Sequence, residues 1–231
     1  MIAEVGHFRG FPPDGIPFFF ELQEQQSRTW FAANKKRFER LWSEPLRALV
    51  ADLTAALGDT YPGLAEVQPH FFRIQRDVRF AADKSPYKTN VSAMLPVRPT
   101  VGDDETIPGM YLSFGLDGGL VAVGCWQLER EKLDAYRRAV ADDATGAALG
   151  QLVDRLRKAG FELSSHGELK RPPAPYPRDH ARAELLRRKG LAVANHTIPD
   201  DLLGQPGLVD WLADSLRQAA PLLRWLDRTL G

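Results

Sequence analysis

Hydrophobic residues follow a helical period near the start of the chain and a strand period in its centre. From about residue 16 to residue 58 they recur three and four positions apart, which predicts a helical part with Ser27 as an N-cap. From about residue 70 to residue 126, short runs rich in β-formers predict strands, the first of them over residues 71–74. Asp117-Gly118-Gly119 lies between two such runs and predicts a hairpin turn.

The last part of the chain, from about residue 128 to residue 231, combines helical periods with short strand-like runs. We expect a helix that Asp179 caps and that reaches residue 188, and a helical pair over 208–230 that is interrupted near Pro221. Helices and strands do not alternate as they would in a parallel doubly wound sheet. The pattern therefore predicts an α+β fold, an antiparallel sheet with helices packed against it, as a single domain over residues 1–231.

The composition is that of an ordinary globular protein with balanced charge. Of the 231 residues, 44% are hydrophobic, so the chain can bury a sizeable core, and 30 basic residues match 30 acidic ones. Zero net charge argues against a general attraction to nucleic acid or acidic lipid. No apolar run reaches the roughly 18 residues of a membrane span, and the single Cys125 excludes an internal disulfide. We expect a soluble cytoplasmic protein with no membrane partner.

One segment, residues 73–88, concentrates positive charge in this neutral chain. It carries the basic residues Arg73, Arg76, Arg79, Lys84 and Lys88 and the acidic residues Asp77 and Asp83. Guanidinium groups stay charged and match the geometry of carboxylates and phosphates. The segment therefore indicates an ion-pair network, an anion site, or both. We interpret three residues as structural ion-pair residues, Arg73, Asp77 and Asp83. We expect five to bind a ligand: Arg76, Arg79, Lys84, Tyr87 and Lys88.

A second basic pair, Lys170 and Arg171, stands in a segment that is rich in proline. Prolines restrict the backbone and would present these side chains rigidly, although a rigid connector explains the same pattern. We count both residues among the ligand-binding candidates. We expect Lys170 or Arg171 to share a solvent-accessible cleft with Arg79, Lys84 and Tyr87.

No metal or cofactor follows from the sequence. The histidines show no close ligand spacing; they are His7, His70, His166, His180 and His196. Gly118-Gly119 lacks the following Lys-Ser/Thr of a nucleotide loop, and Cys125 beside Trp126 is typical of a buried thiol. We therefore expect no metal and no cofactor.

Three motif clusters together resemble the Domain of Unknown Function 2461, a family of bacterial and some fungal proteins. The clusters are Arg73-x-x-Arg76-Asp77-x-Arg79-Phe80-x-x-x-Lys84-x-Pro86-Tyr87-Lys88, Trp30-Phe31-x-x-Asn34-Lys35, and Leu169-Lys170-Arg171-Pro172-Pro173 with Tyr176, Asp179-His180 and Leu185-Leu186-x-x-Lys189. One departure is Gln25-Gln26, where the family pattern has asparagines. The resemblance covers most of the chain and implies that the three clusters belong together. It implies no particular reaction.

Three functions fit the charged segment. The first is a site for a small anionic or phosphorylated ligand, at which Asp77 or Asp83 would serve as a proton acceptor if the protein is an enzyme. No nucleophile accompanies these charges, so the pattern names no reaction. The second is nucleic-acid binding through a local basic stripe, against which the zero net charge argues. The third is a partner-binding protein, of unknown oligomeric state, in which the segment only stabilises the fold.

Overall fold

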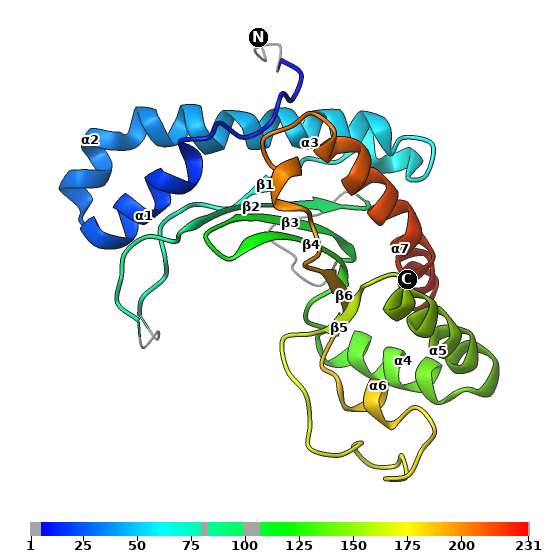
Figure 1. The fold of residues 1–231 in the computed structure, drawn as a ribbon. Coiled ribbons are helices and arrows are strands. Elements are labelled where there is room, and N and C mark those ends of the chain that lie inside the picture. Colours follow the sequence, from blue (N-terminus) through cyan, green and yellow to red (C-terminus); the bar gives the residue numbers. More distant parts are fainter. Residues whose placement is uncertain (1–5, 80–82, 99–106, 231) are drawn as a thin grey trace.

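Six antiparallel strands form a central sheet in the computed structural model, which describes residues 6–79, 83–98 and 107–230 (Figure 1). Along the chain the strands are β1 (His70–Phe71), β2 (Asn90–Pro96), β3 (Gly109–Gly115), β4 (Gly118–Cys125), β5 (Glu162–Ser164) and β6 (Leu191–Asn195). Their order across the sheet is β1-β2-β3-β4-β6-β5, so β1 and β5 form its two edges. The expected α+β fold with an antiparallel sheet is confirmed.

Helices from both ends of the chain cover one face of the sheet (Figure 1). They are α1 (Gly15–Gln25), α2 (Arg28–Phe38), the π-helical turn η1 (Glu39–Ser43), α3 (Glu44–Ala56) and α7 (Leu208–Leu230). Ser27 Oγ accepts a hydrogen bond from Trp30 N over 3.1 Å, which confirms the expected N-cap of α2. The interruption expected near Pro221 is wrong: α7 is continuous, because buried residues on both sides of the proline, among them Ala220 and Leu222, pack into the core.

The remaining helices lie toward the β5 edge. They are α4 (Arg130–Ala141), α5 (Asp143–Lys158) and the short α6 (Ala183–Arg187), and two 3-10 turns complete the chain, η2 (Pro62–Glu66) and η3 (Asp200–Leu202). The helix expected from Asp179 is wrong in its start, because Arg182 N donates to His180 Nδ1 over 3.0 Å and keeps the preceding residues in a turn. No helix within the described ranges combines the length and apolar character needed to cross a membrane.

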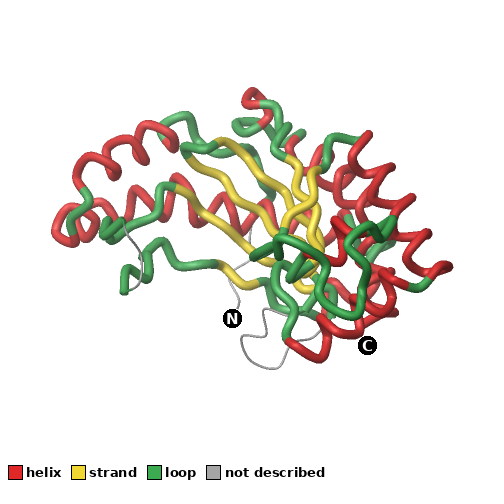
Figure 2. Tube along the Cα trace, turned by 90° about the horizontal axis from the view of Figure 1, so that it is seen from below, coloured by secondary structure: helices red, strands yellow, loops and turns green. Residues whose placement is uncertain are grey.

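On β2, β3 and β4 some positions between the core-facing residues are partly exposed and mark an open face of the sheet, whereas Ser92 and all five residues of β6 are buried. On β2, Val91, Ala93 and Leu95 are at most 5% exposed, while Met94 between them is partly exposed. Tyr111, which pairs with Met94 across β3, is also partly exposed. Seen from below, the yellow strands lie in front of the red helices over most of the sheet (Figure 2). Helices therefore cover only the core face there.

The N-terminal layer is fixed to a segment near the other end of the chain. Phe11 N donates to Leu203 O over 2.8 Å. Gly10 adopts a φ of +106°, and a Cβ at this position would lie 2.1 Å from Gly204 O. Only glycine combines this backbone conformation with so close an approach. The sheet therefore reaches its final cover only when both ends of the chain are in place.

Candidate anion site on the basic arm

Residues 73–79 and 83–88 leave the sheet after β1 as the two sides of an arm, which we call the basic arm (Figure 1). Its two sides are joined by Arg76 N donating to Pro86 O over 2.9 Å, Lys88 N donating to Ile74 O over 2.8 Å, and a bridge between Gln75 and Tyr87. The strand expected over 71–74 is therefore wrong in its end: β1 stops at Phe71, Phe72 N still donates to Ser92 O over 3.0 Å, and from Ile74 onward the backbone pairs within the arm. Phe80 of the motif lies outside the described residues.

Tyr87 fixes the arm to the helical layer. Its side chain is 5% exposed and stacks on Phe31 of α2, with 4.5 Å between the ring centroids. Gln26, between α1 and α2, accepts from Tyr87 N over 3.1 Å and donates to Tyr87 O over 3.3 Å. We expected Tyr87 to face a solvent-accessible cleft; the structure instead buries its ring, so it supports the arm from within.

Gln26 is a site-supporting residue that the sequence analysis did not identify. It has a φ of +24°, a positive value that asparagine tolerates better than most other residues. The sequence carries one signal of this role. The chain departs from the family's asparagines at Gln25-Gln26, and the nearby cluster that contains Phe31 belongs with the basic motif in the resemblance. In the structure the turn between α1 and α2 holds the base of the arm through Gln26.

Acidic side chains within the arm pair with two of its arginines. Arg79 Nη2 lies 2.6 Å from Asp77 Oδ2, and Arg76 pairs with Asp83. Hydrogen bonds from the Arg79 side chain and backbone lower the pKa of Asp77 to about 2. Both pairs are accessible to solvent; the Arg79 side chain is 77% exposed. Asp77 and Asp83 therefore do form ion pairs, but in the exposed positions where such pairs contribute little stability.

Two cations at the base of the arm stand apart from these pairs. Within the described part of the chain, neither Arg73 nor Lys88 forms an ion pair with a carboxylate. Burial lowers the pKa of Lys88, and the charges of Arg73 and Arg76 lower it further. The Lys88 ammonium lies 5.7 Å from the ring centroid of Phe72. Arg73, Arg76 and Lys88 thus form a cationic cluster, which we call the arm-base cluster. Lys84 lies further out, where its Nζ donates to Val78 O over 2.9 Å.

Lys170 and Arg171 lie at the other side of the molecule. They follow β5, whereas the basic arm follows β1, and these strands are the opposite edges of the sheet (Figure 1). Five strand spacings of about 4.8 Å separate the two edges by on the order of 24 Å. The cleft that we expected Lys170 or Arg171 to share with Arg79 and Lys84 is therefore not formed.

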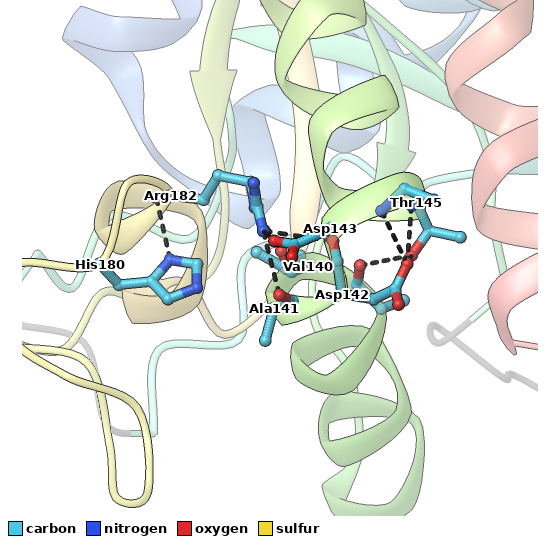
Figure 3. Close-up of polar contacts among 9 residues, drawn as sticks. Val140, Ala141, Asp142, Asp143, Thr145, His180 and Arg182 are labelled. Atoms are coloured by element: carbon cyan, nitrogen blue, oxygen red, sulfur yellow. Dashed lines mark hydrogen bonds and ion pairs between the residues drawn. The ribbon is translucent and has the colours of Figure 1, made fainter.

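The C-terminal motif segment instead supports the junction of α4 and α5 (Figure 3). The Arg182 guanidinium donates to Val140 O over 2.6 Å and to Ala141 O over 3.0 Å, at the end of α4. Asp142 Oδ1 accepts from Thr145 N over 2.9 Å and caps α5. A cation at carbonyls that the helix leaves unpaired is a favourable C-terminal cap. The contacts of Arg182 are thus those of a structural residue.

A metal site or an enclosed pocket would be an alternative to the basic arm. Among the described residues, no three His, Cys, Asp or Glu side chains gather as a metal ion would require. A shallow hollow of about 550 Å³ lies at α4, α5 and α7, lined in part by Arg138, Asp142 and Arg228. It is far from the basic arm (Figure 1) and joins none of the candidate residues to one another.

Comparison with known proteins places the chain in a family. The profile of the family described as "Conserved hypothetical protein (DUF2461)" matches residues 14–225, which include all three motif clusters. No curated protein and no solved structure gives a significant match. Because the matched region covers most of the sequence, the chain belongs to the Domain of Unknown Function 2461 family.

Proposed function

We propose that the protein binds a phosphorylated or carboxylated ligand at the arm-base cluster. The observation that carries this proposal is the contrast among the cations. Arg79 pairs directly with Asp77, whereas Arg73 and Lys88 form no ion pair within the described residues, although the charge of Arg73 helps to lower the pKa of Asp77. An anion between Arg73 and Lys88 would supply the missing counter-charge.

A bound anion would relieve the repulsion among these cations. Lys88 is partly buried and lies near Arg73 and Arg76, so its charged form is disfavoured in the unliganded protein. A bound phosphate or carboxylate would reverse this effect and accept hydrogen bonds from guanidinium forks. The clamp from Gln26 to Tyr87 holds the neighbouring backbone, so the cations are positioned before a ligand arrives.

The proposal concerns binding and not a reaction. Asp77 and Asp83 are engaged by Arg79 and Arg76. Burial of the Tyr87 ring removes it from the ligand-contacting residues. Lys170 and Arg171 are left out because they lie at the opposite edge of the sheet.

Thermal unfolding tests the proposal. We would measure Tm with phosphate, pyrophosphate and dicarboxylates at fixed ionic strength. At roughly 100 times its dissociation constant a ligand adds about 2.7 kcal/mol, which corresponds to about 5–10 °C in a domain of this size. The double variant Arg73→Gln with Lys88→Gln should lose the shift. The matched control, Lys170→Gln with Arg171→Gln, should keep it. A shift that persists in the first variant, or no shift with any anion, would refute the site.

A further inference from the structure

The open face of the sheet borders the arm-base cluster at Phe72, whose ring centroid lies 5.7 Å from the Lys88 ammonium. Phe71 faces the helices, since the Arg47 guanidinium of α3 lies 4.6 Å from its ring centroid. Phe72, the next residue, is on the other side and contacts Tyr111 of β3, with 5.9 Å between the ring centroids. His70 lies 4.6 Å from Phe72 and pairs with Met94 in the sheet register. These rings therefore belong to the open face.

A row of side chains extends across this face from one edge toward the other. By the strand register, His70 is followed by Met94, Tyr111, Ala122 and Ala194. The first four of these are exposed or partly exposed, and none carries a carboxylate. The row is thus a surface of rings and small apolar groups, with cations at one end.

Aromatic and cationic groups meet where the row reaches the basic arm. Phe72 is 36% exposed, which is high for so large an apolar side chain. The Lys88 ammonium lies 5.7 Å from its ring centroid, and the charge of Arg73 acts on Lys88. A ligand that places a planar group on Phe72 can therefore place an anionic group on Lys88 or Arg73.

The extent of this row across several strands favours an extended ligand over a compact one. Small ligands are usually enclosed by concave pockets, which cover most of their surface. A polymer has no need of such a pocket, because it combines several shallow contacts along a surface.

We infer that the open face binds single-stranded nucleic acid. A base stacks on Phe72 beside Tyr111, and the adjoining phosphates lie on Arg73 and Lys88. The chemistry is that of other single-strand sites, where aromatic rings receive bases and basic groups follow the backbone. This inference rests on the proposed function, because the phosphates occupy the same cationic cluster. Beyond the proposed function, it names single-stranded nucleic acid as the ligand and the open face of the sheet as the surface that receives its bases.

Fluorescence anisotropy of the full chain tests the inference. The probes are a labelled mixed-sequence oligonucleotide of about 20 nucleotides, as single-stranded DNA and RNA, and the corresponding DNA duplex, in about 50 mM salt. We expect a single strand to bind more tightly than the duplex. Phe72→Ala should weaken this binding by about fivefold or more, the equivalent of one lost stacking contact. Phe20→Ala is the matched control, since Phe20 is 57% exposed on α1, in the helical layer, and it should bind as the native protein does.

The dependence on salt separates stacking from charge. Removal of two phosphate contacts by Arg73→Gln with Lys88→Gln should reduce the slope of log affinity against log salt by about 1.4, whereas Phe72→Ala should leave it unchanged. Equal binding of duplex and single strand, or an equal loss in Phe20→Ala and Phe72→Ala, would overturn the inference. If pyrophosphate raises Tm but no oligonucleotide binds, the nucleic-acid inference fails and the anion site stands. If neither binds, both fail.

Discussion

Gln26 holds the backbone of Tyr87 at both of its polar groups. The Gln26 carboxamide accepts from Tyr87 N over 3.1 Å and donates to Tyr87 O over 3.3 Å, across 61 residues of sequence. Arg76 Nε donates to the same Tyr87 carbonyl over 3.0 Å. A helix-linking turn, a buried tyrosine and an arginine of the cationic cluster are therefore parts of a single contact. Stability of the arm and binding of anions should consequently respond together to changes at Gln26.

Gln26→Ala should destabilise the protein by about 1–2 kcal/mol, because two partly buried backbone groups of Tyr87 lose a partner. It should also speed hydrogen exchange at the Tyr87 amide and reduce the rise in Tm that anions produce. Gln25→Ala is the control, since Gln25 is exposed and should change little. Gln26→Gly relaxes the positive φ and still removes the carboxamide. If the glycine variant were as stable as the native protein, the clamp would have no energetic role.

Lys88→Met should raise the stability of the unliganded protein at neutral pH, by about 0.5 kcal/mol or more. The ammonium is disfavoured by burial and by Arg73 and Arg76, while methionine keeps contact with Phe72. The same variant should bind anions more weakly. Chemical denaturation with and without pyrophosphate measures both effects, and a variant less stable than the native protein would contradict the repulsion.

The lowered pKa of Lys88 also predicts a dependence on pH. Between its folded pKa and the ordinary value of 10.5, the unfolded chain binds more protons at this site than the folded chain does. The contribution of Lys88 to the free energy of unfolding should therefore rise with pH across that interval. Subtracting the pH profile of Lys88→Met from that of the native protein isolates this contribution. A difference that falls with pH would mean that the pKa of Lys88 is raised instead.

Asp77 should titrate with a pKa of about 2, because Arg79 donates to its carboxylate from the side chain and the backbone. Its stabilising effect should be present above the ordinary pKa of 3.8 and disappear as the pH falls toward 2. Since the pair is exposed, Asp77→Asn should change Tm little at neutral pH. Carboxyl NMR titration gives the pKa directly, and Arg79→Gln should return it toward 3.8. An unchanged value in that variant would assign the shift to another group.

Two glycines of α5 should respond in opposite directions to alanine. A Cβ at Gly146 would lie 2.1 Å from Val140 O and 2.6 Å from Arg182 Nε. Gly146→Ala should therefore lower stability by about 2 kcal/mol. Gly150 has open space around its Cβ position, so Gly150→Ala should raise stability by about 0.5–1 kcal/mol. Thermal unfolding measures the stability of both variants. An unchanged stability of Gly146→Ala would show that Val140 and Arg182 can move to make room for the added Cβ.

Short-range patterns explain why much of the fold was predictable from the sequence. Ser27 caps α2, and the hairpin predicted at Asp117-Gly118-Gly119 forms with Leu116 and Asp117 between β3 and β4, because each signal depends on residues within a few positions of one another. The predicted end of the first strand failed for a long-range reason, the pairing of Gln75 with Tyr87. The interruption expected at Pro221 failed because burial of the surrounding leucines and alanines outweighs the local preference of proline.

The candidate site was less predictable, because its geometry depends on contacts that sequence spacing does not encode. Charge alone located the arm, but it could not show that Asp77 pairs with Arg79 while Arg73 and Lys88 are left together. Nor could it show that the ring of Tyr87 points inward to Phe31. Two proline-flanked basic segments looked like partners in sequence, and the strand order places them at opposite edges.

The position of β6 between β4 and β5 has a consequence for how the protein folds. β5 leaves the ribosome before β6, yet β6 is its only neighbour in the sheet order. The hairpin of β3 and β4 forms between neighbouring residues. In contrast, β5 can pair only after β6 has been synthesised, and Phe11 can bond to Leu203 only after residue 203 has been synthesised. Contacts between such distant residues slow folding, since a long loop has to close before they form. We therefore expect the nascent chain to form the β3–β4 hairpin early. The pairing of β5 with β6 and the contact between Phe11 and Leu203 should form only late in synthesis.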